Sequence, residues 1–280
     1  TSAWTHKDVN SERGSEQFVE LGFAKEVFPR PKPIGTMRRV IELGTMPDEE
    51  AIILDFFAGS GSFAHAALQL AADNKRKLRT VSIQLPEAID NESKESKAAF
   101  EFCKENSLPL NICSITRERL RRASTLLKSE PTTVDFDHGF KYFRLAGSNI
   151  NQWKPDRTDL EETLLSHKEH LVEGRTEQDV LYELLLKRGI ELTVPIEERQ
   201  AAGKTIYSIG YGVLFACLDT SIAAADVDDV AQGILAWHKE LDPETDTHVF
   251  FRDSAFADDI AKTNIAAILE QNGISHVRSL

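Results

Sequence analysis

Cysteine, net positive charge and long apolar runs are all lacking or scarce in this sequence of 280 residues. The three cysteines lie far apart without metal-ligand spacing, which argues against a metal site and suits a reducing, cytoplasmic compartment. The formal net charge of -12 disfavours nucleic-acid binding over the whole surface, because phosphate contacts need clustered Lys and Arg. A local basic groove stays possible. No apolar run approaches the ~20 residues that a membrane helix needs.

The composition is that of an ordinary globular protein, long enough for one large domain or two smaller ones. The chain opens with Thr1-Ser2-Ala3-Trp4-Thr5-His6, which has neither an initiator Met nor a signal-peptide pattern. We therefore expect the chain to be part of a longer protein.

Apolar runs and helical patterns alternate in the first half of the chain, after a proline-rich entry segment at residues 28–33. Strands separated by helices of this size predict parallel βαβ units and an α/β fold. The predicted strands cover residues 51–57, 80–85 and 110–115, and the predicted helices cover residues 34–43, 62–73 and 92–105. A basic helix is expected from Thr116 onward. We interpret its four arginines (Arg117, Arg119, Arg121 and Arg122) as a solvated face, with direct phosphate contact as the alternative.

The pattern changes at Ser129-Glu130-Pro131, where we place a domain boundary. The remainder predicts a second, smaller α/β unit without an internal repeat. Its expected helices cover residues 159–170, 177–187, 226–239 and 258–272. Its expected strands cover residues 136–145, 248–251 and the C-terminus, with a loop at 149–159 and a hairpin at 204–220 that turns at Gly210-Tyr211-Gly212. The acidic residues Asp253, Asp258 and Asp259 are interpreted as solvated or helix N-terminal charges.

The segment Ile52-Ile53-Leu54-Asp55-Phe56-Phe57-Ala58-Gly59-Ser60-Gly61-Ser62 carries the functional signal. It predicts a buried strand, a tight glycine turn and a helix whose N-terminal N–H groups favour electron-rich ligand atoms. Ser62 could cap that helix. His65, one turn into the helix, is interpreted as a partly exposed structural residue rather than a base.

Three interpretations of this turn were weighed. Gly59-Ser60-Gly61 also fits a dinucleotide fingerprint, but the second strand offers Gln84 where that scheme needs a carboxylate. Asp55 has no role there, whereas a buried carboxylate would pair with the sulfonium or ammonium of S-adenosylmethionine (AdoMet). A tight turn that binds nothing is the third interpretation.

The sequence resembles amino-group DNA methyltransferases, and more specifically the modification (Mod) subunits of type III restriction-modification systems. The resemblance covers essentially the whole chain. The motifs that carry it are Pro31-Lys32-Pro33 with the following helix, residues 54–61, the Gln-Leu-Pro-Glu ending at residues 84–87, and residues 117–123, 175–187 and 251–264. Phe63 departs from the small polar residue usual in the family.

The resemblance implies a Rossmann-like AdoMet-binding half-domain over residues 30–128. Residues 1–29 then follow an absent target-recognition region, and residues 129–280 form the C-terminal α/β domain. Asp55 and the backbone of residues 57–61 should contact the methionine end of AdoMet, and Gln84 or Glu87 should lie near the ribose. Phe56 and Phe57 are interpreted as core rather than adenine-stacking residues. The implied cofactor-binding set is Lys32, Pro33, Asp55, Phe56, Phe57, Ala58, Gly59, Ser60, Gly61, Gln84 and Glu87.

The family's Asp-Pro-Pro-Tyr type catalytic tetrapeptide is absent, because none of the ten prolines is adjacent to another. No catalytic residue is therefore assigned. We expect the AdoMet-binding and C-terminal portion of an adenine-N6 DNA methyltransferase that is inactive alone. The alternative is a non-catalytic binding or assembly module, a decayed or split Mod subunit, and an NAD(P)-binding enzyme ranks last. Implied partners are DNA, through the full-length subunit, a second Mod copy and the restriction (Res) subunit. No membrane partner is expected.

Overall fold

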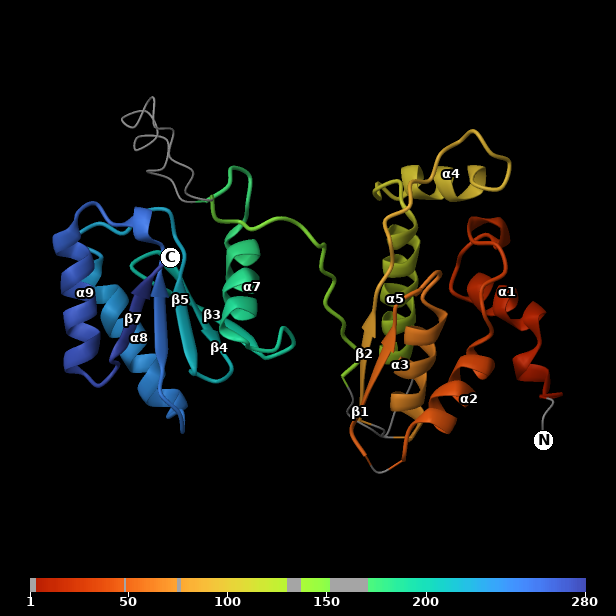
Figure 1. The fold of residues 1–280 in the computed structure, drawn as a ribbon, viewed down its shortest axis with the longest axis horizontal. Helices are drawn as coiled ribbons and strands as arrows, with labels where there is room; N and C mark the ends of the chain where they lie inside the picture. Colours follow the sequence, from red (N-terminus) through yellow and green to blue (C-terminus); the bar gives the residue numbers. More distant parts are fainter. Residues whose placement is uncertain (1–3, 48, 75–76, 130–136, 152–170) are drawn as a thin grey trace, which may run out of the picture. The chain divides into compact units, whose positions relative to one another are not determined.

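The computed structural model describes residues 4–47, 49–74, 77–129, 137–151 and 171–280. It divides into two compact units, Thr1–Phe143 and Arg144–Leu280, each described by itself below. Both units are mixed α/β (Figure 1).

Unit 1 is built from five described α-helices and one pair of strands. Its elements in chain order are η1 (Lys7–Val9), α1 (Ser11–Glu20), η2 (Lys25–Val27), α2 (Ile34–Gly44), β1 (Ala51–Asp55), α3 (Ser62–Asn74), β2 (Leu78–Ser82), α4 (Lys97–Glu105) and α5 (Ile112–Ser129). Strands β1 and β2 pair in parallel, with Leu54 opposite Val81. The segment β1–α3–β2 is thus the predicted βαβ unit. Backbone pairing continues one step past both strands, because Ile83 N donates to Asp55 O and Ala58 N donates to Ile83 O.

One face of the β1–β2 pair is covered and the other is not. On the covered face, Ile53 and Leu78 pack with α2 and α3 around buried Ile34, Ile41 and Leu70 (Figure 1). Side chains alternate between the two faces of a strand. The alternate positions of unit 1 are correspondingly exposed: Ile52 63%, Leu54 55%, Phe56 59%, Val81 48% and Ile83 50%. Among the described residues, no core cluster includes these outer side chains.

The strand predicted at residues 110–115 is wrong, because helix α5 begins at Ile112. The side chain of Asn111 accepts a hydrogen bond from Ser114 N and so satisfies an amide of the first helical turn. Ile115 faces the core formed by α1, α4 and α5. Its spacing from Ile112 belongs to a helix, although the short β-branched run also suits a strand.

The other predicted elements of unit 1 are present with shifted bounds. Strand β2 begins and ends earlier than expected, and helix α4 begins only at Lys97. Before α4, the Asp90 carboxylate accepts hydrogen bonds from Glu92 N and Ser93 N, which holds that stretch as a turn. The strand expected at 136–145 is also wrong in its described part, since residues 137–146 have no regular structure.

Unit 2 is a five-stranded sheet between helices. Its described elements are α7 (Glu177–Arg188), β3 (Ile196–Ala201), β4 (Lys204–Ile209), β5 (Leu214–Cys217), α8 (Val227–Leu241), β6 (His248–Phe251), η3 (Asp253–Ala255), α9 (Asp259–Gln271) and β7 (His276–Ser279). The strand order is β3-β4-β5-β6-β7. The first two pairings are antiparallel and the last two are parallel.

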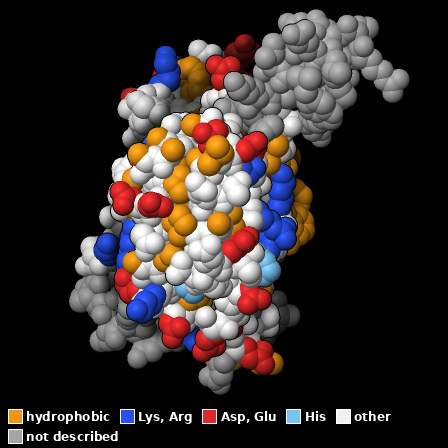
Figure 2. All heavy atoms as spheres, turned by 90° about the vertical axis from the view of Figure 1, so that its left-hand side faces the viewer, with side chains coloured by type: hydrophobic (Ala, Val, Ile, Leu, Met, Phe, Trp, Pro, Cys, Tyr) orange, Lys and Arg blue, Asp and Glu red, His pale blue; other side chains and the backbone are white. Residues whose placement is uncertain are grey.

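Both faces of the central strands of this sheet are buried. Phe215 and Phe251 pack with α8 and α9 on one face, while Tyr207 and Phe250 pack with α7 on the other (Figure 1). Figure 2 looks onto the α9 side of this unit, where surface hydrophobic side chains are interspersed with charged and polar groups.

The sequence correctly predicts most of unit 2. Helix α7 begins with a capping box between Thr176 and Asp179 and ends at the left-handed Gly189. The hairpin with its turn at Gly210-Tyr211-Gly212 is confirmed, and Asp258 caps α9 through Ala261 N. Strand β3 was missed. The helix predicted at 159–170 lies outside the described residues.

Candidate functional site

The glycine turn joins β1 to α3 in the conformation that its sequence predicts. Gly59 and Gly61 have φ angles of 52° and 76°, in the left-handed region that L side chains rarely adopt. A Cβ atom at Gly61 would lie 3.2 Å from Thr116 Cγ2, which leaves little room for any side chain. The backbone therefore makes a tight strand-to-helix turn against α5.

Side chains from two other segments fix this turn. The Gln84 side chain accepts a hydrogen bond from Gly59 N at 2.8 Å. Thr116, on α5, donates to Gly59 O at 2.5 Å. The backbone N–H and C=O of Gly59 are thus both hydrogen-bonded to side chains, which lie 25 and 57 positions away in the chain. Thr116 was not predicted as a site residue.

Arg119 fixes the next part of the turn from one helical turn further along α5. Its side chain is fully buried, and its Nη1 donates to Ser60 Oγ at 2.8 Å and to Ser62 Oγ at 2.7 Å. Burial lowers the pKa of the Arg119 guanidinium to about 10, so it stays charged near neutral pH. Ser62 is the first residue of α3, and its hydroxyl serves Arg119 instead of the expected cap.

The solvated-face interpretation of the basic helix is therefore wrong for two of its four arginines. Besides Arg119, Arg122 donates to Leu21 O and Gly22 O and lies 4.2 Å from the centre of the Phe23 ring. Arg122 also pairs with Glu118, which binds the exposed Arg121 as well. These pairings, that with Arg121 first, lower the pKa of Glu118 to about 2 against the effect of burial.

Asp55 differs from its prediction as a buried carboxylate without a local partner. It is half-buried, and its Oδ1 accepts a hydrogen bond from Phe57 N at 3.0 Å. One oxygen thus shapes the entry to the turn, and the carboxylate still lines the adjoining cavity.

A cavity of about 460 Å³ lies between the glycine turn and the proline-rich entry segment. A volume of this size suits a small-molecule ligand. Six predicted site residues line it: Lys32, Asp55, Phe57, Ala58, Gly59 and Ser60. Its remaining lining residues are Phe28, Arg30, Pro31, Met37, Leu54, Ser62 and Phe63.

Comparison with known proteins finds a family match in the first part of unit 1. Residues 1–95 match the profile of the N6_N4_Mtase family, described as DNA methylase. Helix α2, the glycine turn and α3 all lie in this methylase segment, whereas Thr116 and Arg119 lie beyond it.

Curated relatives include three type III restriction-modification Mod subunits. The chain is 30% identical to the StyLTI Mod subunit of Salmonella typhimurium over 52% of its length, and 30% identical to the EcoP15I Mod subunit of Escherichia coli over 64%. It is 27% identical to the EcoPI Mod subunit of Escherichia phage P1 over 74%. The matches span only 20%, 26% and 30% of those proteins. The predicted resemblance to Mod subunits is confirmed.

Five predicted site residues of the methylase segment do not line the cavity: Pro33, Phe56, Gly61, Gln84 and Glu87. Pro33 precedes the first turn of α2, and Gly61 acts through backbone conformation. Phe56 and Phe57 are exposed, so their interpretation as core residues is wrong. The sequence contained a signal for Phe28 and Arg30, since they alternate with the prolines of the entry segment. Only the fold shows that this segment faces the turn.

His65 was expected to be a partly exposed structural residue. It is buried instead. Burial, with a smaller contribution from Arg119, lowers its pKa to about 3. The imidazole is thus neutral at physiological pH, and it lies outside the cavity lining.

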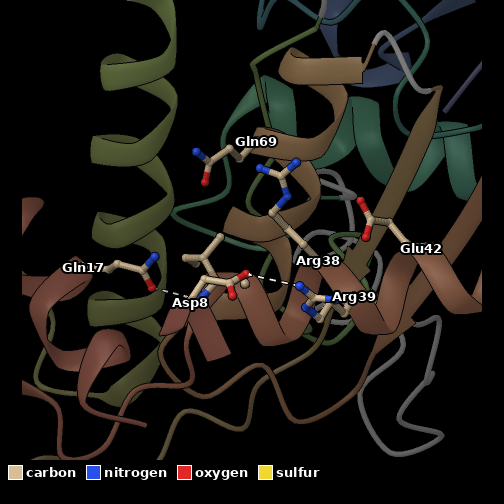
Figure 3. Close-up of a pocket in the computed structure, with 8 residues that line it drawn as sticks. Asp8, Gln17, Arg38, Arg39, Glu42 and Gln69 are labelled. Carbon is tan, nitrogen blue, oxygen red and sulfur yellow. Dashed lines mark hydrogen bonds and ion pairs between the residues drawn. The ribbon is translucent and has the colours of Figure 1, made fainter. Parts of the chain in front are cut away.

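A second, more polar pocket of about 330 Å³ lies beside α2 (Figure 3). Arg38 pairs with Asp73 at 2.5 Å and Arg39 contacts Asp8 at 3.9 Å, so its cations already face carboxylates. It offers weaker grounds for a ligand site than the cavity at the glycine turn.

No group of His, Cys, Asp and Glu side chains in the described ranges is placed to hold a metal ion. Within the same ranges, no helix is long and apolar enough to span a membrane.

Proposed function

We propose that unit 1 binds AdoMet and that the chain is the AdoMet-binding and C-terminal portion of an adenine-N6 DNA methyltransferase of a type III system. The cavity at the glycine turn is the observation that carries this proposal. It places an acidic side chain, aromatic rings and a helix N-terminus around one ligand-sized space. A cofactor that combines a cationic centre, a carboxylate and an adenine ring fits this mixture.

In the proposed complex, Asp55 attracts the cationic methionine end, which lies against the backbone of the glycine turn. Lys32 lines the same cavity. Gln84 acts through the protein, because its Oε1 holds Gly59 N and its Nε2 donates to Leu85 O. Of the two proposed ribose ligands, neither lines the cavity, and Glu87 is the one whose side chain is exposed, so it keeps that proposed role. Phe28 and Phe57 offer rings for the adenine.

The exposed apolar face of β1–β2 supports the proposal that unit 1 is only one part of the methyltransferase. We propose that the remaining methyltransferase polypeptide, which carries the catalytic tetrapeptide, packs on Ile52, Leu54, Phe56, Val81 and Ile83. Leu54 belongs both to this face and to the cavity wall, so the same polypeptide would close the site. Without it, nothing in this sequence orients the target amino group, and the chain alone does not methylate DNA. DNA, a second Mod copy and a Res subunit are proposed as partners of the complete assembly.

Calorimetric titration of AdoMet tests the cofactor. We expect binding by the wild-type chain and at least about tenfold weaker binding by Asp55→Ala, since charge-assisted contacts are stronger than neutral ones. Asp246→Ala is the matched control, because this carboxylate of unit 2 is highly exposed. Unchanged affinity in Asp55→Ala, or tighter binding of NAD than of AdoMet, would contradict the proposal.

Transfer of labelled methyl groups to duplex DNA tests incompleteness. The probe is the portion of the StyLTI Mod subunit that precedes its match to this chain. We expect methylation only when the two polypeptides are combined, and loss of their association in Leu54→Lys with Val81→Lys. Methylation by this chain alone would refute the proposal. AdoMet binding without restored methylation would favour the alternative, a decayed or split assembly module.

A further inference from the structure

Arg119 is a buried cation without a carboxylate partner among the described residues. Its side chain has 0% exposure. Its Nη1 donates hydrogen bonds to two serine hydroxyls, while Nε and Nη2 have no partner in the described part of the chain. The Phe18 ring lies 5.4 Å from the guanidinium carbon and offers a further, weaker contact. Burying an unpaired charge costs folding free energy. The position of Arg119 therefore indicates a role other than stabilising the fold.

The hydrogen bonds of the Ser60 and Ser62 hydroxyls indicate that Arg119 acts on the cavity. Ser60 Oγ and Ser62 Oγ both accept from Arg119, and they lie 3.1 Å from each other. One hydroxyl can donate to the other, which leaves one hydroxyl hydrogen without an acceptor among the described residues. Both serines line the cavity. The pair therefore presents a donor to the cavity, with a positive charge directly behind it.

A donor backed by a cation selects an anionic acceptor. The Lys32 ammonium and the N-terminus of α3 also act in the same direction on a ligand in this cavity. The Asp55 carboxylate lines the cavity as well and favours a cationic group instead. The cavity is thus suited to a zwitterionic group, such as the amino-acid end of a cofactor.

We propose that Arg119 is a positioning and specificity-determining residue that acts through Ser60 and Ser62 to select a ligand carboxylate. This inference rests on the proposed binding of AdoMet and extends it. Arg119 does not touch the ligand. It orients both hydroxyls toward the site and supplies the charge that strengthens their hydrogen bond to a carboxylate.

The test compares AdoMet with decarboxylated AdoMet, which keeps the adenosine, the sulfonium and the amine. Calorimetry of the wild-type chain should show about tenfold or greater preference for AdoMet. In Arg119→Met this preference should fall to about onefold, and Arg119→Lys should retain part of it. A merely structural role would weaken both ligands equally and leave the ratio unchanged, which would overturn the inference.

Arg121→Met is the matched control, because it removes the same charge from the exposed face of α5. It should keep the wild-type ratio; if it lowers the ratio equally, general electrostatics explains the effect and the inference fails. The Ser60→Ala with Ser62→Ala variant retains the buried cation and should also lose the preference, which covers the case in which Arg119→Met does not fold. If the wild-type chain binds both ligands equally, only this inference falls. If it binds neither, alone or with the StyLTI portion, the proposed function falls with it.

Discussion

Both units contain apolar strands, but helices cover these strands differently in the two units. In unit 2, β4, β5 and β6 alternate between a core with α8 and α9 and a core with α7. In unit 1, β1 and β2 pack against α2 and α3 on one face, and the outer face is exposed. A parallel strand that is apolar on both faces normally has helices on both. The exposed apolar face of unit 1 therefore supports the proposed packing of a further layer there, whereas the helices of unit 2 cover both faces of its central strands.

The largest expected difference in the free energy of unfolding is between two phenylalanine substitutions, one in the sheet of unit 2 and one just after β1 in unit 1. Phe215→Ala in β5 removes a fully buried ring and should lower the free energy of unfolding of unit 2 by about 3–5 kcal/mol. Phe56→Ala, just after β1, should cost less than about 0.5 kcal/mol in unit 1 because its ring is largely exposed. Urea unfolding followed by circular dichroism measures both. A comparable loss in both variants would break the comparison.

A pH-dependent difference follows from buried His65 in unit 1. Its folded-state pKa of about 3 lies below the ordinary value of 6.5, so the unfolded state binds the proton more readily. Stability is fully present above pH 6.5 and is lost as the pH falls toward 3. Between pH 6.5 and 4.5 the loss should be about 2 kcal/mol.

Urea midpoints at those two pH values measure this loss. His65→Gln should flatten the pH dependence, whereas the exposed His6→Gln control should retain it. An equally steep dependence in His65→Gln would assign the effect to other groups.

A smaller effect on the stability of unit 2 is expected from a substitution at the start of α7, the helix on the second face of its sheet. Thr176→Ala removes half of the capping box of α7 and should destabilise unit 2 by about 1 kcal/mol. Thr125→Ala in α5 is the control, since its hydroxyl only bonds back to Arg121 O within the helix. Thermal unfolding checks the order, and an equal effect of the two substitutions would contradict it.

The smallest effect should occur on the exposed face of unit 1. Val81→Thr changes a β-branched side chain that is 48% exposed and should alter the free energy of unfolding by less than about 0.5 kcal/mol. Chemical unfolding of the isolated chain measures it. A loss above 1 kcal/mol would show that this face is already packed, and would remove the contrast between the units.

Local signals explain what the sequence predicted well. The apolar run into Gly59 and Gly61 specifies strand, turn and helix within a dozen residues. The capping box at Thr176 likewise acts over three positions. Such features are legible because the residues that determine them are neighbours in the chain.

The misses share a dependence on distant residues or on less common turn residues. Arg119 looks like any member of a basic helix until the fold places it behind Ser60 and Ser62. Strand β3 carries the polar run Glu197-Glu198-Arg199-Gln200, and its hairpin turn places Ala202 and Gly203 at φ 50° and 71°. Alanine is rare at positive φ, where Asn or Asp is the usual signal, so that hairpin was not recognised.

Thr116 and Arg119 lie beyond the segment that matches the family, which limits where the chain can be truncated without disturbing the glycine turn. The family match ends at residue 95, yet two of the three side chains that hold the glycine turn, Thr116 and Arg119, come from α5. A fragment ending at that limit would keep both glycines and Gln84 but lose the two groups supplied by α5. The boundary of the family match and the boundary of the compact unit therefore differ here, and the glycine turn depends on the longer one.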